Sequence, residues 1–249
     1  MHLSSLPVRR VRVETDTDPA DQPPPPATPW YLAIPAVAQL AHDGWDLTAA
    51  TVLVGENGAG KSTLVEALAG AFGMGAEGGS TGSRHSTRVS ESGLAERLVL
   101  ERGAGASRRG FFLRAETMHS FYSYLEAHPS DDPTEPVFHE MSHGESFLSL
   151  MLSRTRKRGL YVLDEPESAL SFTGCLALVS LLTDLVADGS QVVLSTHSPV
   201  LAALPGARIW EIGDWGMRTS AWDDLELVRR WRGFLDAPER YLRQIGAGG

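Results

Sequence analysis

Gly55-Glu56-Asn57-Gly58-Ala59-Gly60-Lys61-Ser62-Thr63 connects an apolar run, 51–54, to an alanine-rich run, 64–70. The spacing GxxxxGK[ST] between a strand and a helix is that of a phosphate-binding loop. Its glycines let several backbone N–H groups converge on one point, to which the following helix adds its positive dipole end. We expect Lys61 to reach the outer phosphates and the Ser62 hydroxyl to bind magnesium. The stretch predicts binding of a nucleoside triphosphate.

Two later apolar runs, 160–163 and 191–194, end in polar residues. In a parallel sheet, ligands lie at the carboxyl ends of the strands. Asp164 is therefore expected to hold magnesium, and Glu165 to act as general base towards the attacking water. A lone histidine is more often structural, but the place of His197 at a strand end favours a contact with the γ-phosphate or the water.

Length and composition limit the class of protein. The 249 residues suit one large α/β domain. The single cysteine, Cys175, lies in an apolar run, so we expect a buried structural thiol and a reducing compartment. A net charge of −9 does not indicate a protein that binds nucleic acid through an overall positive charge, but it does not exclude a local basic patch. No apolar run approaches the roughly 18 residues of a membrane span, and no signal peptide is visible. We expect a cytoplasmic, soluble protein without direct membrane insertion.

The first half of the chain alternates between strand patterns and breakers. Residues 8–14 alternate apolar and charged side chains, which favours an edge strand whose arginines face water over an arm that binds nucleic acid. The proline-rich segment 16–29 predicts an extended connector. A short helix at 37–41 and strands over 45–54 are expected to follow. Further on, the patterns predict a flexible excursion (71–82), strands at 94–100 and 111–115, a helix at 119–127 and a loop at 129–136.

Residues 144–158 predict a helix, with Ser142 as N-cap and Glu145 at the capping-box position. The segment ends in Arg154, Arg156, Lys157 and Arg158. These cations either stabilise the helix end or form a patch that faces DNA or a partner.

The motifs together resemble an ABC-type ATPase domain. In order, they match its Walker A loop, signature, Walker B strand, D-loop and switch histidine: Gly55–Thr63, Ser142-His143-Gly144-Glu145-Ser146, Leu163-Asp164-Glu165-Pro166, Ser168-Ala169-Leu170-Ser171 and Ser195-Thr196-His197. The resemblance covers about 30–212. Within this class the chain is most similar to stand-alone ATPases often labelled AAA-family ATPases. These resemble the ATPase heads of SMC/RecF-type proteins more than transporter subunits.

The resemblance implies roles for individual residues. ATP would be bound by the whole phosphate loop, Gly55, Glu56, Asn57, Gly58, Ala59, Gly60, Lys61, Ser62 and Thr63. Ser62 and Asp164 would hold Mg²⁺, while Lys61, Glu165 and His197 would be catalytic. Ser142 and Gly144 would contact the ATP of a second subunit, because an exposed helix start binds anions. ATP would then be sandwiched within a head-to-tail homodimer.

The chain departs from the family's pattern at three places. The signature normally reads Ser-Gly-Gly-Gln, and here Ser146 is shorter than the usual glutamine. The Q-loop glutamine is missing, and Glu116 is expected as its magnesium-side substitute. Trp30 and Tyr31 are either the aromatics that stack on adenine or core residues.

We expect an α/β fold, an ABC-type P-loop head with a mostly parallel sheet. The whole chain, 1–249, would form one domain with an N-terminal antiparallel β-lobe (1–29) and a core (about 30–212). The remaining parts would be a small helical signature lobe (about 117–158) and a C-terminal helical tail (about 223–243) that packs back on the core.

The expected function is Mg-dependent ATP hydrolysis by a switch that dimerises on ATP and acts on a separate protein or DNA partner, in DNA maintenance or defence. No heptads are visible, which excludes SMC-type coiled-coil arms. The alternatives are the ATP-binding subunit of a membrane transporter, a non-hydrolytic regulator and a P-loop kinase. Intact Asp164, Glu165 and His197 argue against the regulator, and a kinase would leave the signature without a role.

Overall fold

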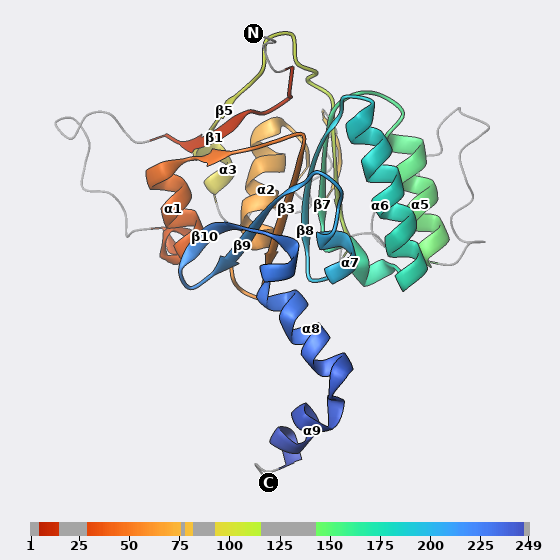
Figure 1. Ribbon diagram of the computed structural model, residues 1–249. Helices are drawn as coiled ribbons and strands as arrows, with labels where there is room; N and C mark the ends of the chain where they lie inside the picture. The colour runs from red at the N-terminus through yellow and green to blue at the C-terminus, as the bar shows by residue number, and fades with distance from the viewer. Residues whose placement is uncertain (1–4, 15–28, 76–77, 82–92, 116–142, 247–249) are drawn as a thin grey trace, which may run out of the picture.

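The computed structural model describes residues 5–14, 29–75, 78–81, 93–115 and 143–246 (Figure 1). Its main sheet has the strand order β10-β9-β3-β8-β7-β6-β4. The central strands β9, β3, β8, β7 and β6 run parallel, and β10 and β4 pair antiparallel at the two edges. The sheet is therefore mostly parallel, as predicted. The bounds are β3 Ala50–Gly55, β4 Gly79–Ser80, β6 Gly110–Arg114, β7 Leu160–Asp164, β8 Gln191–Thr196, β9 Arg208–Gly213 and β10 Gly216–Ser220.

Helices cover both faces of this sheet (Figure 1). One face carries α5 (His143–Arg154), α6 (Phe172–Ala187), α7 (Pro199–Ala202) and the start of α8 (Glu226–Asp236), and the other carries α1 (Pro35–Asp43) and α2 (Lys61–Phe72). Side chains of a strand alternate between faces, so Val52 joins the first core cluster and Leu53 the second. Packing of these two clusters on both faces keeps the parallel strands aligned, so their carboxyl ends lie together at one edge of the sheet.

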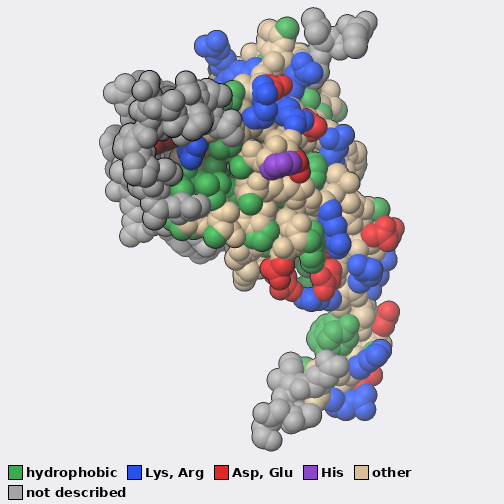
Figure 2. Space-filling model, turned by 90° about the vertical axis from the view of Figure 1, so that its left-hand side faces the viewer, with side chains coloured by type: hydrophobic (Ala, Val, Ile, Leu, Met, Phe, Trp, Pro, Cys, Tyr) green, Lys and Arg blue, Asp and Glu red, His purple; other side chains and the backbone are tan. Residues whose placement is uncertain are grey.

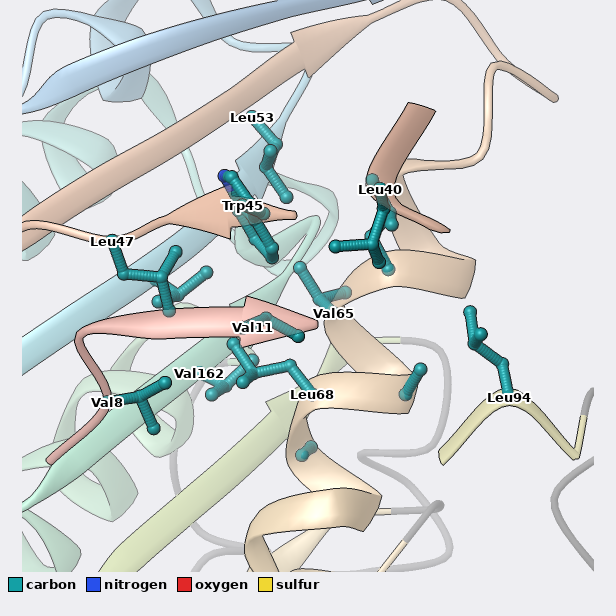
Figure 3. Close-up of a cluster of buried hydrophobic side chains, with 14 of the residues drawn as sticks. Val8, Val11, Leu40, Trp45, Leu47, Leu53, Val65, Leu68, Leu94 and Val162 are labelled. Carbon is teal, nitrogen blue, oxygen red and sulfur yellow. The ribbon is translucent and has the colours of Figure 1, made fainter. Parts of the chain in front are cut away.

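A second, three-stranded antiparallel sheet covers α2. Its strands are β1 (Arg10–Val13), β2 (Trp45–Asp46) and β5 (Leu98–Glu101), in the order β2-β1-β5. Figure 3 shows Val11 of β1 gathered with Leu68 of α2 and Val162 of β7 in the core between the sheets. The lobe therefore draws on three separate segments, and β1 is its central strand. The prediction of an edge strand at 8–14 was wrong, because both sides of β1 are paired.

Gln191 joins the two sheets. Its fully buried side chain accepts a hydrogen bond from Val8 N (2.9 Å) and donates to Val8 O (2.7 Å) and Thr48 O (2.9 Å). Buried backbone groups need such partners. The contact fixes the N-terminal segment on the first residue of β8.

Several local predictions need correction. Residues 94–97 form a helix, α3 (Leu94–Arg97), and only 98–101 form a strand. Leu94 is fully buried, and a Cβ on Gly70 would lie 2.9 Å from Ala95 Cβ, so tight packing on α2 decides the helix. The excursion predicted at 71–82 contains the end of α2, with Phe72 in the core, and strand β4.

Helix α5 ends at Arg154 rather than at Arg158. The side chain and the backbone N–H of Thr155 both donate to Met151 O, at 2.7 and 2.9 Å. Arg156, Lys157 and Arg158 lie beyond the helix, so helix-end stabilisation does not account for them. The segments predicted at 119–127 and 129–136, and most of the signature lobe, lie outside the described residues.

The C-terminal segment is helical as expected but does not pack back along its length. After the short turn η5 (Trp222–Asp224), Leu225 and Val228 are buried in the core, and Leu227 packs partly against it. Helices α8 and α9 (Pro238–Gly246) then leave the body at the lower end of Figure 1. Trp231, Leu235 and Leu242 are 48%, 71% and 58% exposed. Among the described residues, none of the helices is long and apolar enough to cross a membrane.

Candidate nucleotide site

The phosphate loop runs from the end of β3 to the start of α2, as its sequence predicts. Gly58 and Gly60 have φ of 80° and 101°, a conformation that favours glycine. Gly55 is required for another reason, because a Cβ there would lie 2.4 Å from Ile212 O of β9. Gly60 is the N-cap of α2. The dipole of this helix therefore points into the loop.

Lys61 is buried, and its ammonium group lies among the other predicted site residues. Nζ donates to Glu56 O (3.1 Å) and lies 2.8 Å from His197 Nε2 and 3.7 Å from Glu165 Oε1. Burial lowers the pKa of Lys61, although the carboxylates of Glu165, Asp164 and Glu167 partly oppose this. The structure therefore brings residues from the Walker A, Walker B and switch motifs together.

His197 Nε2 also lies 3.0 Å from Glu165 Oε1. This nitrogen can either accept from the Lys61 ammonium or donate to Glu165, because it holds one proton or one lone pair. Glu165 itself has φ of 48°, in the left-handed region, and no other described non-glycine residue has a positive φ. Strained backbone of this kind clusters at functional sites.

Asp164 is 3% exposed and lies level with Arg114 and Ser195 on the neighbouring strands. Ser195 Oγ donates to Asp164 Oδ1, Ser62 Oγ donates to the same atom at 3.2 Å, and Arg114 Nε lies 3.7 Å from Oδ2. Burial raises the pKa of Asp164, opposed chiefly by the Ser195 hydrogen bond and the charge of Arg114. The carboxylate and the Ser62 hydroxyl therefore face the same point beside the phosphate loop.

This donor set has the chemistry of a magnesium site that relies on phosphate and water for its remaining ligands. Mg²⁺ prefers oxygen ligands and usually takes only one or two from protein in nucleotide sites. The described residues contain no group of three or more His, Cys, Asp or Glu able to enclose a metal. Glu116, the predicted substitute for the Q-loop glutamine, lies outside the described residues.

The signature residues are only partly described. Ser142 lies outside the described residues, whereas Gly144 lies at the start of α5, where a Cβ would be 3.6 Å from Ala169 O. Gly144 therefore touches the short helix η4 (Pro166–Ala169), which carries the D-loop. Of the two aromatics, Tyr31 in η1 (Trp30–Ala33) is a core residue, and Trp30 is 58% exposed.

Sequence reasoning missed several residues of this region. Glu167 Oε1 accepts the backbone N–H of His197, and Arg114 pairs with Glu66 of α2 at 2.5 Å. Helix α8 closes one side of a cleft of about 550 Å³ against the phosphate loop and the β9–β10 turn. Its lining includes Glu56, Asn57, His197, Trp215 and Arg230. The position of Arg114 at the end of a predicted strand could have identified it as a site residue. In contrast, nothing in the sequence predicts that α8 lines the cleft.

The N-terminal part of α8 is bonded to the phosphate loop and to the sheet. Arg230 pairs with Glu56 of the phosphate loop and, at 2.5 Å, with Glu226. Glu211 of β9 is 3% exposed and accepts the backbone N–H of Glu226 at 2.8 Å, and Arg218 donates to its other oxygen at 3.0 and 2.6 Å. A carboxylate from the sheet therefore caps α8.

Similarity to known proteins covers most of the part of the chain that forms this site. Residues 50–117 and 125–203, more than half of the chain, match the family described as "AAA domain, putative AbiEii toxin, Type IV TA system". The cytochrome c biogenesis ATP-binding export protein CcmA of Rhodopseudomonas palustris (strain BisB5) is 30% identical over 176 residues, which covers 64% of this chain and 84% of CcmA. The solved SMC head domain from Thermotoga maritima is 13% identical, with a TM-score of 0.40, over 71% of this chain and 92% of that domain. The chain belongs to this AAA domain family and is an ABC-type P-loop ATPase.

Proposed function

We propose that this ATPase is a molecular switch that dimerises on Mg-ATP and acts on a separate protein or DNA partner. The observation that carries the proposal is the convergence of Lys61, Glu165 and His197 within 3.7 Å of one another beside the phosphate loop. In this proposal the loop residues 55–63 bind the triphosphate, and Ser62 and Asp164 hold Mg²⁺, with Glu116 as a further ligand. Bound magnesium would neutralise charge that develops on the phosphates.

The residues around the site have distinct proposed roles. Glu165 orients the attacking water and takes its proton as general base. A γ-phosphate draws the Lys61 ammonium towards itself, which frees His197 Nε2 to contact Glu165 or the phosphate. Ser142 and Gly144, at the start of α5, contact the ATP of a second copy. Because ATP completes that interface, hydrolysis would release the pair.

We also propose that 1–249 functions as one ATPase unit in the cytoplasm, with a signature lobe at about 117–158 and a C-terminal tail at about 223–243. DNA maintenance or defence would suit such a switch.

The second candidate is the ATP-binding subunit of a membrane transporter, which the similarity to an ATP-binding export protein favours. A neighbouring gene for a protein with several membrane spans would support that alternative.

The test compares the wild type with Glu165→Gln. The solution mass of each is measured with and without Mg-ATP, alongside phosphate release. The variant should stay a monomer without ATP, become a dimer with Mg-ATP and release no phosphate. Equal turnover in both proteins, with no dimer in either, would refute the switch.

A further inference from the structure

Cations gather at the edge of the main sheet that lies opposite the nucleotide site. Two loops meet there, 102–109 between β5 and β6, and 155–159 between α5 and β7. They carry six exposed cations, one of which is Arg156; the other five, which we call the basic edge, are Arg102, Arg108, Arg109, Lys157 and Arg158. Both loops precede parallel strands whose carboxyl ends form the nucleotide site (Figure 1). The basic edge and ATP can therefore be engaged at the same time.

Hydrogen bonds hold the two loops side by side. Ser107 Oγ donates to Arg158 O at 2.9 Å, and Leu160 N donates to Arg109 O at 3.0 Å. A Cβ on Gly159 would lie only 2.7 Å from Arg109 O, so the backbones touch. The fold therefore brings together cations that are about fifty positions apart in the chain, as the Ser107–Arg158 bond spans 51.

Among the described residues, the cations of the basic edge lack the carboxylate partners that several other surface arginines have. Arg10, Arg12 and Arg232 each pair with a carboxylate at 2.5–2.6 Å. Within the described part of the chain, the five side chains of the basic edge form no ion pair. Asp188 lines the same hollow as Lys157 and Arg158 without pairing with either. Burial and then the nearby charge of Arg108 lower the pKa of Arg102.

Unpaired like charges in a chain of net charge −9 favour an external anion. Arginine presents a planar fork that matches phosphate oxygens, and four of the five cations are arginine. Neither loop contains an aromatic residue that could stack on an unpaired base or insert into a lipid surface. Figure 2 shows the face on the left of Figure 1, where Lys and Arg side chains at the upper end lie among Asp and Glu side chains. The exposed tryptophans 215 and 231 lie at the nucleotide cleft instead.

We propose that the basic edge binds the phosphate backbone of double-stranded nucleic acid without regard to base sequence. This proposal extends the proposed function, because it names the chemistry of the partner. Binding of nucleic acid does not itself depend on the ATP-driven switch. Only the consequence of binding, the action of the switch on that partner, rests on the proposed function. Binding is measured without nucleotide, and ATP turnover without DNA. The two proposals can therefore fail separately.

The experiment titrates a fluorescently labelled DNA duplex with the full chain at several salt concentrations and follows anisotropy. Five phosphate contacts predict a slope of log affinity against log salt of about −4 to −5. The variant Arg108→Glu/Arg109→Glu should bind roughly tenfold to a hundredfold more weakly, with a slope shallower by about 2. The control Arg229→Glu/Arg240→Glu changes the charge equally on α8 and α9, and should bind as the wild type does.

Thermal unfolding and ATP turnover of both variants verify that the fold and the nucleotide site are intact. Equal weakening in the two variants would mean a response to net charge alone and would overturn the proposal. So would undetectable duplex binding at low salt, or tighter binding of a single strand. Binding to vesicles of anionic phospholipid but not to the duplex would assign the surface to membranes instead.

Discussion

The ammonium nitrogen of Lys61 lies 2.8 Å from Nε2 of His197, although 136 positions separate the two residues in the chain. The same histidine nitrogen lies 3.0 Å from Glu165 Oε1. A ring nitrogen can serve only one of these partners at a time. His197 can therefore bond either to Lys61 or to Glu165, and a phosphate that attracts Lys61 would favour the bond to Glu165.

His197→Ala should lower the turnover number about 100- to 10,000-fold, the usual range for a group that assists proton transfer. Nucleotide affinity should change little, because the phosphate loop remains. Phosphate release and titration with a fluorescent ATP analogue measure the two effects. His42→Ala is the matched control, since its side chain is 87% exposed. A variant at His197 with wild-type turnover would remove the histidine from the mechanism.

Asp164→Asn should stabilise the nucleotide-free protein at neutral pH by roughly 0.5–2 kcal/mol, as relief of a strained active site often does. Burial raises the pKa of Asp164 above its ordinary value of 3.8. The folded state therefore binds more protons, and the wild type loses stability as the pH rises from 3.8 through the raised pKa. The asparagine variant lacks this loss, so the difference between the two proteins grows across that window.

Urea unfolding at a series of pH values measures this difference. The exposed Asp236→Asn should show none, and stabilisation by Mg-ATP should be lost only in Asp164→Asn. A difference that shrinks with rising pH would contradict the sign of the shift.

Gln191→Leu should lower the free energy of unfolding by about 3 kcal/mol. The change leaves a buried N–H and two carbonyl groups without partners, and each costs about 1–3 kcal/mol before local relaxation. Gln39→Leu is the control, because Gln39 bonds Met217 N and O in the same way but is only half-buried. Water can replace those bonds, so the loss in denaturant unfolding should be smaller. An equal loss would refute the role of burial.

Glu211→Ala should loosen α8. The substitution removes the cap on Glu226 N, a buried hydrogen bond to a charged group that is worth about 1.5–3 kcal/mol. The side chain of Arg218 is 53% exposed, so water can solvate it once its carboxylate is gone. Hydrogen exchange should accelerate across 226–236 more than in the sheet. Arg230→Ala removes solvent-exposed ion pairs with Glu56 and Glu226, which water screens, and should leave exchange nearly unchanged. Uniform acceleration in both variants would show that Glu211 is not a specific anchor.

Much of the fold and site follows from local sequence. Strand β3, the glycine loop and helix α2 are specified by an apolar run, by glycines that allow positive φ, and by good helix formers. The carboxyl-end rule for parallel strands placed Asp164, Glu165 and His197 at one edge. Residues 94–97 were predicted wrongly because a four-residue apolar pattern fits strand and helix alike, and packing against Gly70 decides.

The sequence by itself determined the phosphate loop, the polar residues at the carboxyl ends of β7 and β8, and the burial of Cys175, because each depends on residues that are adjacent or regularly spaced. Only the tertiary structure decided which distant groups meet. Gln191 reaches Val8, Glu211 caps α8, and Ser107 joins Arg158. These are contacts of single side chains across long separations, and no period or motif encodes them. They depend on how the strands are ordered in the sheets, which packing of the whole chain selects.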